Sequence, residues 1–409
     1  MKRKCILLLV LSIVLLLSML GCQQGENYKL IVYADPGHDN IAHAARMAML
    51  AEYPELEIEV RSFDRFDDYR LILQTEMAAG KGPDVLLFSP DAFVDLCKAM
   101  DAGVFQDLNP WFESDPDLSE LNLNSSVFDG CIYKGQRLYV PLSYLSYTAM
   151  TTKEALQELG ISLSESPTFE EWSDAVWSAA RELKEKLIVR IMLDHAPSRY
   201  AALFGLEMYD PNTKEFLIDS ATFRQALELY KAVYPIDPTW FDPSIELFKS
   251  RDLVFGLEVS YESRLYGLLE NLRTEKPFTF RVPSPFEDRP SAYPYIMAAM
   301  GSGCKNQDLA YQMIRLMLSK ELQKRSFIYI PINQDAEKER FNQTKATDSL
   351  TISTEDILLD LNNIHYMHPF PAPLLEMIDA TMSPWFLDQE EYDVCLENLR
   401  NRLEVYINE

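Results

Sequence analysis

Short apolar runs alternate with amphipathic stretches along the first hundred residues of the chain. The intervening stretches repeat apolar side chains every three or four residues, which is the period of a helix with one buried face. The predicted strands span 30–33, 56–60 and 84–88, and the predicted helices span 40–52, 69–79 and 92–100. This alternation of strand and helix predicts a parallel sheet wrapped by helices. Residues 85–88 are uniformly apolar, which is typical of a central strand that is covered on both faces.

The rest of the chain is richer in helical patterns. Thr168 is expected to cap the helix over 169–187. Residues 336–349 are polar and charged, and we expect a surface segment there. The other predicted helices span 152–159, 223–233, 306–318 and 385–407, and the other predicted strands span 278–282 and 295–300.

The N-terminus carries an export signal. Lys2, Arg3 and Lys4 precede a mostly apolar run over 5–20, which is short for a membrane-spanning helix of roughly 20 apolar residues. The following residues, Gly21 and Cys22, complete a stretch that resembles a bacterial lipobox, in which cleavage before the cysteine frees it to take lipid such as palmitate. A plain signal peptide or an uncleaved anchor is the alternative. We expect the mature chain to work outside the cytoplasmic membrane, tethered through Cys22.

The strong negative charge of the chain argues against nucleic acid and anionic lipid as binding partners. The net charge is −25, and removal of residues 1–21 takes away three cations and no anion, which lowers the charge to −28. Such a surface repels nucleic acid and anionic lipid headgroups. Lipid on Cys22, rather than a basic face, would therefore hold the protein at the membrane. With 47% hydrophobic residues over 409 positions, the chain can bury the cores of two ordinary domains.

The cysteines and histidines give no metal or cofactor pattern. Cysteines beyond Cys22 are far apart in sequence and show no CxxC spacing, at Cys97, Cys131, Cys304 and Cys395. They are isolated core thiols in the interpretation that we favour, while one or two disulfides are the alternative outside the cell. No phosphate-binding glycine loop, dinucleotide fingerprint or serine-nucleophile motif occurs in the sequence. We expect no cofactor, no metal and no enzymatic activity.

Several motifs resemble those of family-1 extracellular solute-binding proteins of ABC importers. The most specific is Ala78-Ala79-Gly80, two further residues, and then Pro83-Asp84-Val85 before the buried strand. The segments 103–108, 135–141 and 305–318 resemble later motifs of the family in the same order. The resemblance covers roughly residues 28–406.

The resemblance implies a two-lobed periplasmic-binding-protein-like fold of type II. Each lobe would be a mostly parallel sheet flanked by helices, with a ligand cleft between the lobes. We expect residues 22–27 to be a tether, and crossings between the lobes near 139–144, 281–285 and 325–331. The first lobe would then comprise 28–140 and 284–324, and the second lobe 141–283 and 325–409.

Physical reasoning places a ligand at the carboxyl ends of the parallel strands. Two loops meet this condition, and both carry carboxylates that can accept two sugar hydroxyls. Members of the family that bind maltose use the matching loops in this way. The candidate residues of these loops are Asp35, His38, Asp39, Pro90 and Asp91.

Aromatic rings are the second group of candidates, because a ring covers the apolar face of a pyranose. Ser260 and Tyr261 occupy the position at which the family often carries a stacking tryptophan, although the sequence there departs from the family pattern. The candidate rings are Tyr144, Tyr147, Tyr261, Tyr293 and Tyr295.

The leading hypothesis is therefore a monomeric, lipid-anchored receptor. It would capture a small solute, expected to be a carbohydrate, and hand it to the transmembrane subunits of an ABC permease. Two alternatives remain from the sequence. One is a sensor subunit that presents its ligand to a membrane kinase, and the other is a surface-anchored glycan-degrading enzyme.

Overall fold

The structure is a computed structural model. It describes residues 29–164, 166–182, 187–191, 208–210, 213, 215–218, 220–233, 253–259, 277–284, 291–326, 329–345, 364–366 and 371–408. The proposed signal peptide, the tether and Cys22 lie outside the described residues, as do Ser260 and Tyr261.

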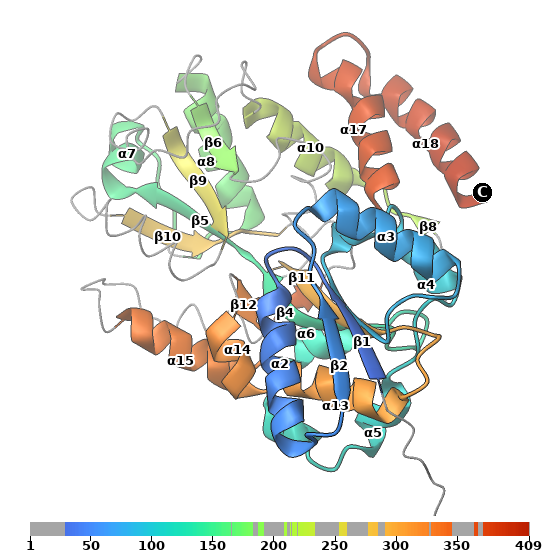
Figure 1. Ribbon diagram of the computed structural model, residues 1–409. Coiled ribbons are helices and arrows are strands. Elements are labelled where there is room, and N and C mark those ends of the chain that lie inside the picture. The colour runs from blue at the N-terminus through green and yellow to red at the C-terminus, as the bar shows by residue number, and fades with distance from the viewer. Residues whose placement is uncertain are drawn as a thin grey trace, which may run out of the picture.

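The larger sheet has seven strands and forms the centre of the first lobe (Figure 1). Its strands are β1 (Lys29–Ala34), β2 (Glu57–Arg61), β3 (Val85–Phe88), β4 (Val140–Leu145), β11 (Ser291–Met300), β12 (Ile330–Pro331) and β13 (His365–Tyr366). The spatial order is β12-β4-β11-β3-β1-β2, with β13 paired to β11. Strand β1 pairs in parallel with both β2 and β3.

Helices cover this sheet. Helix α2 (Asp39–Glu52) packs with α13 (Gln307–Met317) and α14 (Lys320–Ser326), so that segments nearly 270 residues apart in sequence lie side by side (Figure 1). The helices and 3₁₀ turns associated with this sheet are α2 (Asp39–Glu52), α3 (Phe66–Ala78), η1 (Pro90–Ala92), α4 (Leu96–Asp101), α5 (Asn109–Ser114), η2 (Leu118–Leu121), α6 (Ser125–Gly130), α13 (Gln307–Met317), α14 (Lys320–Ser326) and α15 (Gln334–Lys345).

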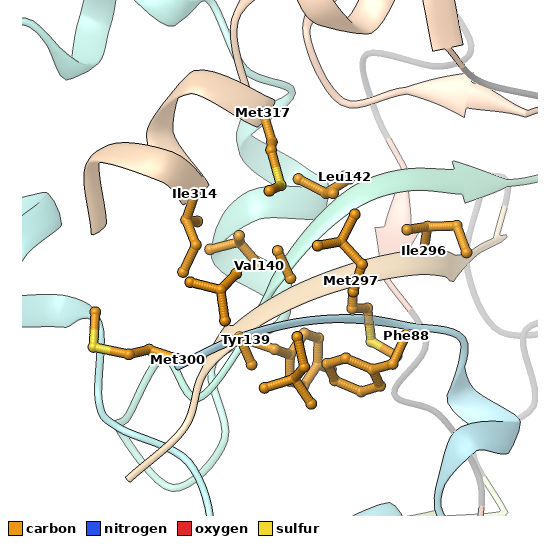
Figure 2. Close-up of a cluster of buried hydrophobic side chains, with 14 of the residues drawn as sticks. Phe88, Tyr139, Val140, Leu142, Ile296, Met297, Met300, Ile314 and Met317 are labelled. Atoms are coloured by element: carbon orange, nitrogen blue, oxygen red, sulfur yellow. The ribbon is translucent and has the colours of Figure 1, made fainter. Parts of the chain in front are cut away.

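The first hydrophobic core lies between the sheet and these helices. Figure 2 shows side chains from β3, β4 and β11 meeting Ile314 and Met317 of α13. Phe88, in the strand predicted to be central, is fully buried, and its ring stacks on Phe105 with centroids 5.9 Å apart. The uniformly apolar sequence of β3 thus results from burial on both faces.

The second lobe is built on a four-stranded sheet of order β10-β5-β9-β6. Its strands are β5 (Tyr147–Thr152), β6 (Leu187–Ile191), β9 (Leu253–Val259) and β10 (Pro277–Arg281), and a small hairpin pairs β7 (Tyr209–Asp210) with β8 (Glu215–Phe216). Its helices are α7 (Lys153–Glu158), α8 (Phe169–Glu182), α10 (Ala221–Val233), α17 (Ala372–Phe386) and α18 (Tyr392–Asn408). A separate hydrophobic core lies here, in which Trp172 packs edge-on against Phe255 at 4.7 Å.

Both sheets are mixed, which corrects the expectation of mostly parallel sheets. Strand β11 runs antiparallel to β3 and to β4, and β5 runs antiparallel to β9 and β10. The physical reason is that β11 follows a segment of the second lobe, so it enters the first sheet from the hinge and runs opposite to β1 and β3. The local alternation of strand and helix before residue 103 carried no sign of this later insertion.

Among the described residues, the chain passes between the two lobes at three places. Strand β4 belongs to the first sheet and β5 to the second, with Ser146 between them, and β10 and β11 make the return. After residue 325, however, β12 and β13 still pair with the first sheet, and α17 is the next described element of the second core. The third passage therefore lies later than the predicted 325–331. The first segment of the first lobe was predicted to end at residue 140, but it continues through β4 to Leu145.

The structure bears on three local predictions. Residues 336–345 of the expected surface segment 336–349 lie in helix α15, where Asn333 Oδ1 accepts the Ala336 N–H at 3.0 Å. The predicted helix 169–187 ends at Glu182, and Leu187 begins β6. Thr168 does cap α8, because its Oγ1 accepts the Glu171 N–H at 3.2 Å and Glu171 Oε2 accepts the Thr168 N–H at 3.1 Å.

The four cysteines of the described residues are free thiols. Cys97, Cys131, Cys304 and Cys395 are all buried, and none is in a disulfide. The interpretation as isolated core thiols is confirmed for these four.

Candidate ligand-binding site

The two predicted loops lie next to each other, because β1 and β3 are neighbours in the sheet. Ala34 pairs with Leu87, so both strands end at the same edge. The loop after β1 runs from Asp35 into α2, and the loop after β3 contains Ser89 and the short turn η1. The carboxyl ends of these parallel strands therefore bring the two loops together, as the sequence predicts.

Asp35 ties the two loops together. Its Oδ2 accepts the Ser89 N–H at 3.1 Å and the Ser89 Oγ–H at 2.7 Å, and its own N–H donates to Leu87 O at 3.0 Å. Asp35 is buried, with 3% of its surface exposed. The carboxylate predicted to bind ligand thus has one oxygen engaged within the protein, and it positions the loops.

His38 projects from the same loop and has unsatisfied polar atoms. Both of its ring nitrogens are shielded from solvent, and neither has a hydrogen-bond partner among the residues that the structure describes. The nearest carboxylate oxygen, Asp35 Oδ1, lies 3.8 Å from Nδ1, which is beyond hydrogen-bond length. A buried imidazole without partners costs free energy that a hydroxyl-bearing ligand would recover.

Tyr295 of β11 meets His38 and connects the two lobes. Its ring lies edge-on to the imidazole with centroids 5.4 Å apart, and the centroid of the Tyr329 ring lies 3.9 Å from that of Tyr295. Tyr295 packs against both hydrophobic cores. Burial raises the pKa of Tyr295, and the neighbouring Tyr329 and the carboxylates of Asp35 and Asp91 raise it further. The phenol therefore stays neutral and is able both to donate and to accept hydrogen bonds.

Tyr147 and Tyr293 form a second aromatic pair. Their rings are 6.5 Å apart at an interplanar angle of 73°, and both pack against the second core. Tyr147 begins β5, directly after the passage from the first sheet. Of the predicted rings, Tyr147, Tyr293 and Tyr295 thus gather where the two lobes join.

Tyr144 is placed differently. It is fully buried in the first core, where its hydroxyl accepts a hydrogen bond from Asn124 Nδ2 at 3.3 Å. Burial raises the pKa of Tyr144 well above its ordinary value, and the nearby Glu337 carboxylate adds to this shift. In this arrangement Tyr144 supports the first lobe from inside, and its ring does not join the other candidate tyrosines where the two lobes meet.

The remaining candidate residues of the two loops, Asp39, Pro90 and Asp91, are partly buried or exposed. Asp39 is the first residue of α2, and its Oδ2 lies 3.8 Å from His43 Nε2. Helix α2 thus begins one residue earlier than predicted. Pro90 and Asp91 lie in η1, where Asp91 is exposed and close enough to Tyr295 to influence the pKa of its hydroxyl.

Tyr329 is the residue that sequence reasoning missed. It directly precedes β12, in a segment that we predicted only as a passage between lobes. Its carbonyl accepts a hydrogen bond from Arg340 Nη1 of α15 at 3.1 Å, which fixes the backbone beside Tyr295. No local pattern marked this residue, because its position depends on the pairing of β12 with β4.

The described part of the chain offers no group of three or more histidine, cysteine, aspartate or glutamate side chains that would hold a metal ion. Within the same residues, no helix has both the length and the apolar character needed to cross a membrane.

Comparison with known proteins identifies the family. The model of the bacterial extracellular solute-binding protein family matches residues 45–348, well over half of the chain. The chain belongs to this family. The family-1 resemblance inferred from the motifs is therefore confirmed, and the protein is an extracellular solute-binding protein.

Solved structures show the same two-lobed fold. The sugar-binding protein MalE from Xanthomonas citri is similar with a TM-score of 0.71 and 14% identity, over 92% of this chain and 96% of MalE. The ABC substrate-binding protein Lmo0181 from Listeria monocytogenes, in complex with cycloalternan, has a TM-score of 0.64 and 14% identity, over 94% of this chain and 100% of Lmo0181.

A third similar structure is the cyclic alpha-maltosyl-1,6-maltose binding protein from Arthrobacter globiformis. It has a TM-score of 0.66 and 15% identity, over 92% of this chain and 98% of that protein. At these identities the similarity establishes the fold. No curated protein matches the chain.

Proposed function

We propose that this solute-binding protein captures a sugar or oligosaccharide between its lobes and delivers it to an ABC permease. The observation that carries the proposal is His38, whose two ring nitrogens are shielded from solvent and have no hydrogen-bond partner among the described residues, next to the Tyr295–Tyr329 pair. Ring nitrogens and phenols bind hydroxyl groups, and aromatic faces cover the C–H face of a pyranose.

The names of the similar structures support a carbohydrate. MalE is a sugar-binding protein, the Listeria protein is in complex with cycloalternan, and the Arthrobacter protein binds cyclic alpha-maltosyl-1,6-maltose. Binding would close the lobes about the passages between β4 and β5 and between β10 and β11, and the closed form would dock on the permease. The solute is bound without any change to its covalent bonds.

Isothermal titration tests the choice of ligand. The panel contains maltose, maltotriose, cycloalternan and cyclic maltosyl-maltose, with a tripeptide and spermidine as non-sugar probes. We expect heat of binding with at least one saccharide. Binding of the tripeptide or spermidine, and of no saccharide, would contradict the proposal.

A matched pair of variants tests the role of His38. His38→Ala is expected to weaken binding of the saccharide about tenfold, because a hydrogen bond to a buried group is lost. His43→Ala is the control, since it changes a histidine of helix α2, which begins directly after His38, and its side chain is 48% exposed. Equal affinities of the two variants for the saccharide would contradict a role of His38 in binding. The thermal midpoints of both variants show whether they are folded.

We also propose that Cys22 carries lipid that holds the protein on the outer face of the cytoplasmic membrane. The support is the sequence of the N-terminal 22 residues and the extracellular character of the family. Growth with an alkyne analogue of palmitate should label the wild-type protein, while Cys22→Ala should be unlabelled and leave the membrane fraction. A labelled Cys22→Ala protein would disprove this site.

A further inference from the structure

The last turn of α18 makes a contact with the first lobe. Helix α18 packs through Cys395, Leu399 and Leu403 into the second core. Tyr406 follows on the same stripe of the helix, three residues after Leu403. Its hydroxyl donates to Asp95 Oδ2 at 2.5 Å, a contact between residues that are 311 positions apart.

Asp95 belongs to the first lobe. It is the N-cap of α4, where its Oδ1 accepts the Lys98 N–H at 2.9 Å, and α4 is anchored in the first core by Leu96, Cys97 and Met100. Asp95 therefore uses one oxygen to begin its own helix and the other to hold a helix of the opposite lobe.

Lys98 completes the contact. Its ammonium lies 4.8 Å from the centroid of the Tyr406 ring, a distance typical of a cation–π interaction. One turn of α4 thus holds both the hydroxyl and the ring of Tyr406. Figure 1 shows the C-terminal end of α18 on the side of the first lobe where α4 lies, away from the strands that pass between the lobes.

We infer that Tyr406, Asp95 and Lys98 form a latch that holds the two lobes in the arrangement of this structure. The latch is separate from the covalent passages, so it adds a second point at which the lobes are fixed relative to each other. Any ligand that favours a different arrangement has to break the latch, and the free energy needed is taken from its affinity.

The latch is also close in sequence to the candidate site. Asp91 of η1 lies four residues before Asp95, and Ser89 in the same segment is bonded to Asp35. A shift of this segment on ligand binding would be transmitted to Asp95. The inference rests on the lobe movement of the proposed function. It adds three residues that set the free energy needed for the lobes to leave the arrangement of this structure.

Distance measurement between the lobes tests the latch without any ligand. Spin labels on p-acetylphenylalanine replace Met47 of α2 and Trp177 of α8, which are 62% and 43% exposed, and the full chain is kept in detergent. Because the label reacts with a ketone, the native cysteines are not affected. The distance distribution is then compared for the wild-type sequence and for Tyr406→Phe.

Tyr406→Phe keeps the ring but removes the hydroxyl that Asp95 holds. We expect the distribution to broaden or to shift, with the population of the wild-type distance falling about tenfold relative to other arrangements, as for loss of a hydrogen bond to a charged group. Lys98→Met, which keeps the apolar stem, should give a smaller change in the same direction. An unchanged distribution for Tyr406→Phe would overturn the latch.

Tyr311→Phe is the matched control. Its hydroxyl donates to Asp115 Oδ2 at 2.7 Å, so the same chemical contact is lost, but both residues lie in the first lobe. We expect its distance distribution to equal that of the wild type, and an equal broadening there would show that the effect is not specific to the latch. Since no sugar is used, failure of sugar binding would not affect this result.

Discussion

Asp84 explains at the level of single residues why the Pro83-Asp84-Val85 motif stands before the central strand. Its Oδ2 accepts the Ile31 N–H at 2.8 Å, and its own N–H donates to Ile31 O at 2.9 Å. Its carbonyl accepts the Gly301 N–H at 3.0 Å. The residue thereby fastens the start of β3 to β1 and to the residue that follows β11. These bonds fix the amino end of β3, at the opposite end of the strand from the loop that contains Ser89 and Asp91.

A glycine is required at position 301, because the backbone there lies close to the backbone of Pro83 and Asp84. A Cβ at this position would lie 2.3 Å from the Pro83 carbonyl oxygen, which belongs to the backbone and cannot move aside by a rotamer change. We predict that Gly301→Ala lowers the free energy of unfolding by about 1–3 kcal/mol, as expected for overpacking. Urea denaturation measures this loss.

Ser302→Ala is the control for Gly301→Ala, because Ser302 is the exposed neighbour and its N–H keeps its bond to Val104 O. It should change the free energy of unfolding by less than about 0.5 kcal/mol. If both variants unfold at the same urea concentration as the wild type, the contact with Pro83 is not tight in solution.

At the scale of elements, an ion pair between Asp115 and Arg315, which are 200 residues apart in sequence, joins the end of α5 to α13. Asp115 at the end of α5 accepts from Arg315 Nε at 2.6 Å and from Tyr311 Oη at 2.7 Å. Its side chain is 7% exposed. Burial by itself would raise the pKa of Asp115, but the hydrogen bonds from Arg315 and Tyr311 outweigh burial, so the pKa is lowered.

The lowered pKa gives a pH dependence of stability. A carboxyl whose pKa is lower in the folded state stabilises the fold above its unfolded pKa of about 3.9, and this contribution is lost as the pH falls through the folded value. We predict that Asp115→Asn lowers the free energy of unfolding by about 1.5–3 kcal/mol at pH 7. The difference from wild type should shrink as the pH falls below about 4.

Urea titrations of both proteins between pH 7 and pH 3 measure this difference. Glu113→Gln, an exposed carboxylate on the same helix, is the control and should give a small difference throughout. A difference between Asp115→Asn and wild type that is constant with pH would contradict the role assigned to the charge.

At the scale of the whole molecule, the sequence predicted what is local. The three strands before residue 103 and the position of both site loops followed from periodicity, because each is determined by neighbouring residues. The antiparallel insertion of β11 did not follow, because it depends on pairing with distant strands. The same holds for the candidate site, where the neighbouring positions of Asp35 and His38 followed from the order of the strands but the position of Tyr329 beside Tyr295 did not.

Tyr144 shows the limit of reasoning from position for a single side chain. Tyr144 lies just before the passage to the second lobe, and this position made its ring a candidate to face a ligand. In an extended strand, however, neighbouring side chains point to opposite faces, and a one-residue difference moves a ring from the surface to the core. Tyr144 lies on the buried side, and Tyr147, after the passage, lies in the second core with Tyr293.

The free thiols bear on how the whole molecule is stabilised outside the cell. Four cysteines could have formed two disulfides, yet all four are buried and single. Burial raises the pKa of Cys97, Cys131 and Cys304 to about 12, so that very little reactive thiolate is present at neutral pH. Two hydrophobic cores, rather than cross-links, then hold the lobes.

We therefore predict that the thermal midpoint is the same with and without dithiothreitol, to within about 1 °C, since no loop of the unfolded chain is closed by a disulfide. Iodoacetamide at pH 8 should modify Cys97, Cys131 and Cys304 at least tenfold more slowly in the native protein than in 6 M guanidinium, as judged by site-resolved mass spectrometry. The denatured sample is the control, because it exposes every thiol to the reagent. A midpoint that falls by several degrees in dithiothreitol would mean that the exported protein is oxidised and that its cores are packed differently around these cysteines.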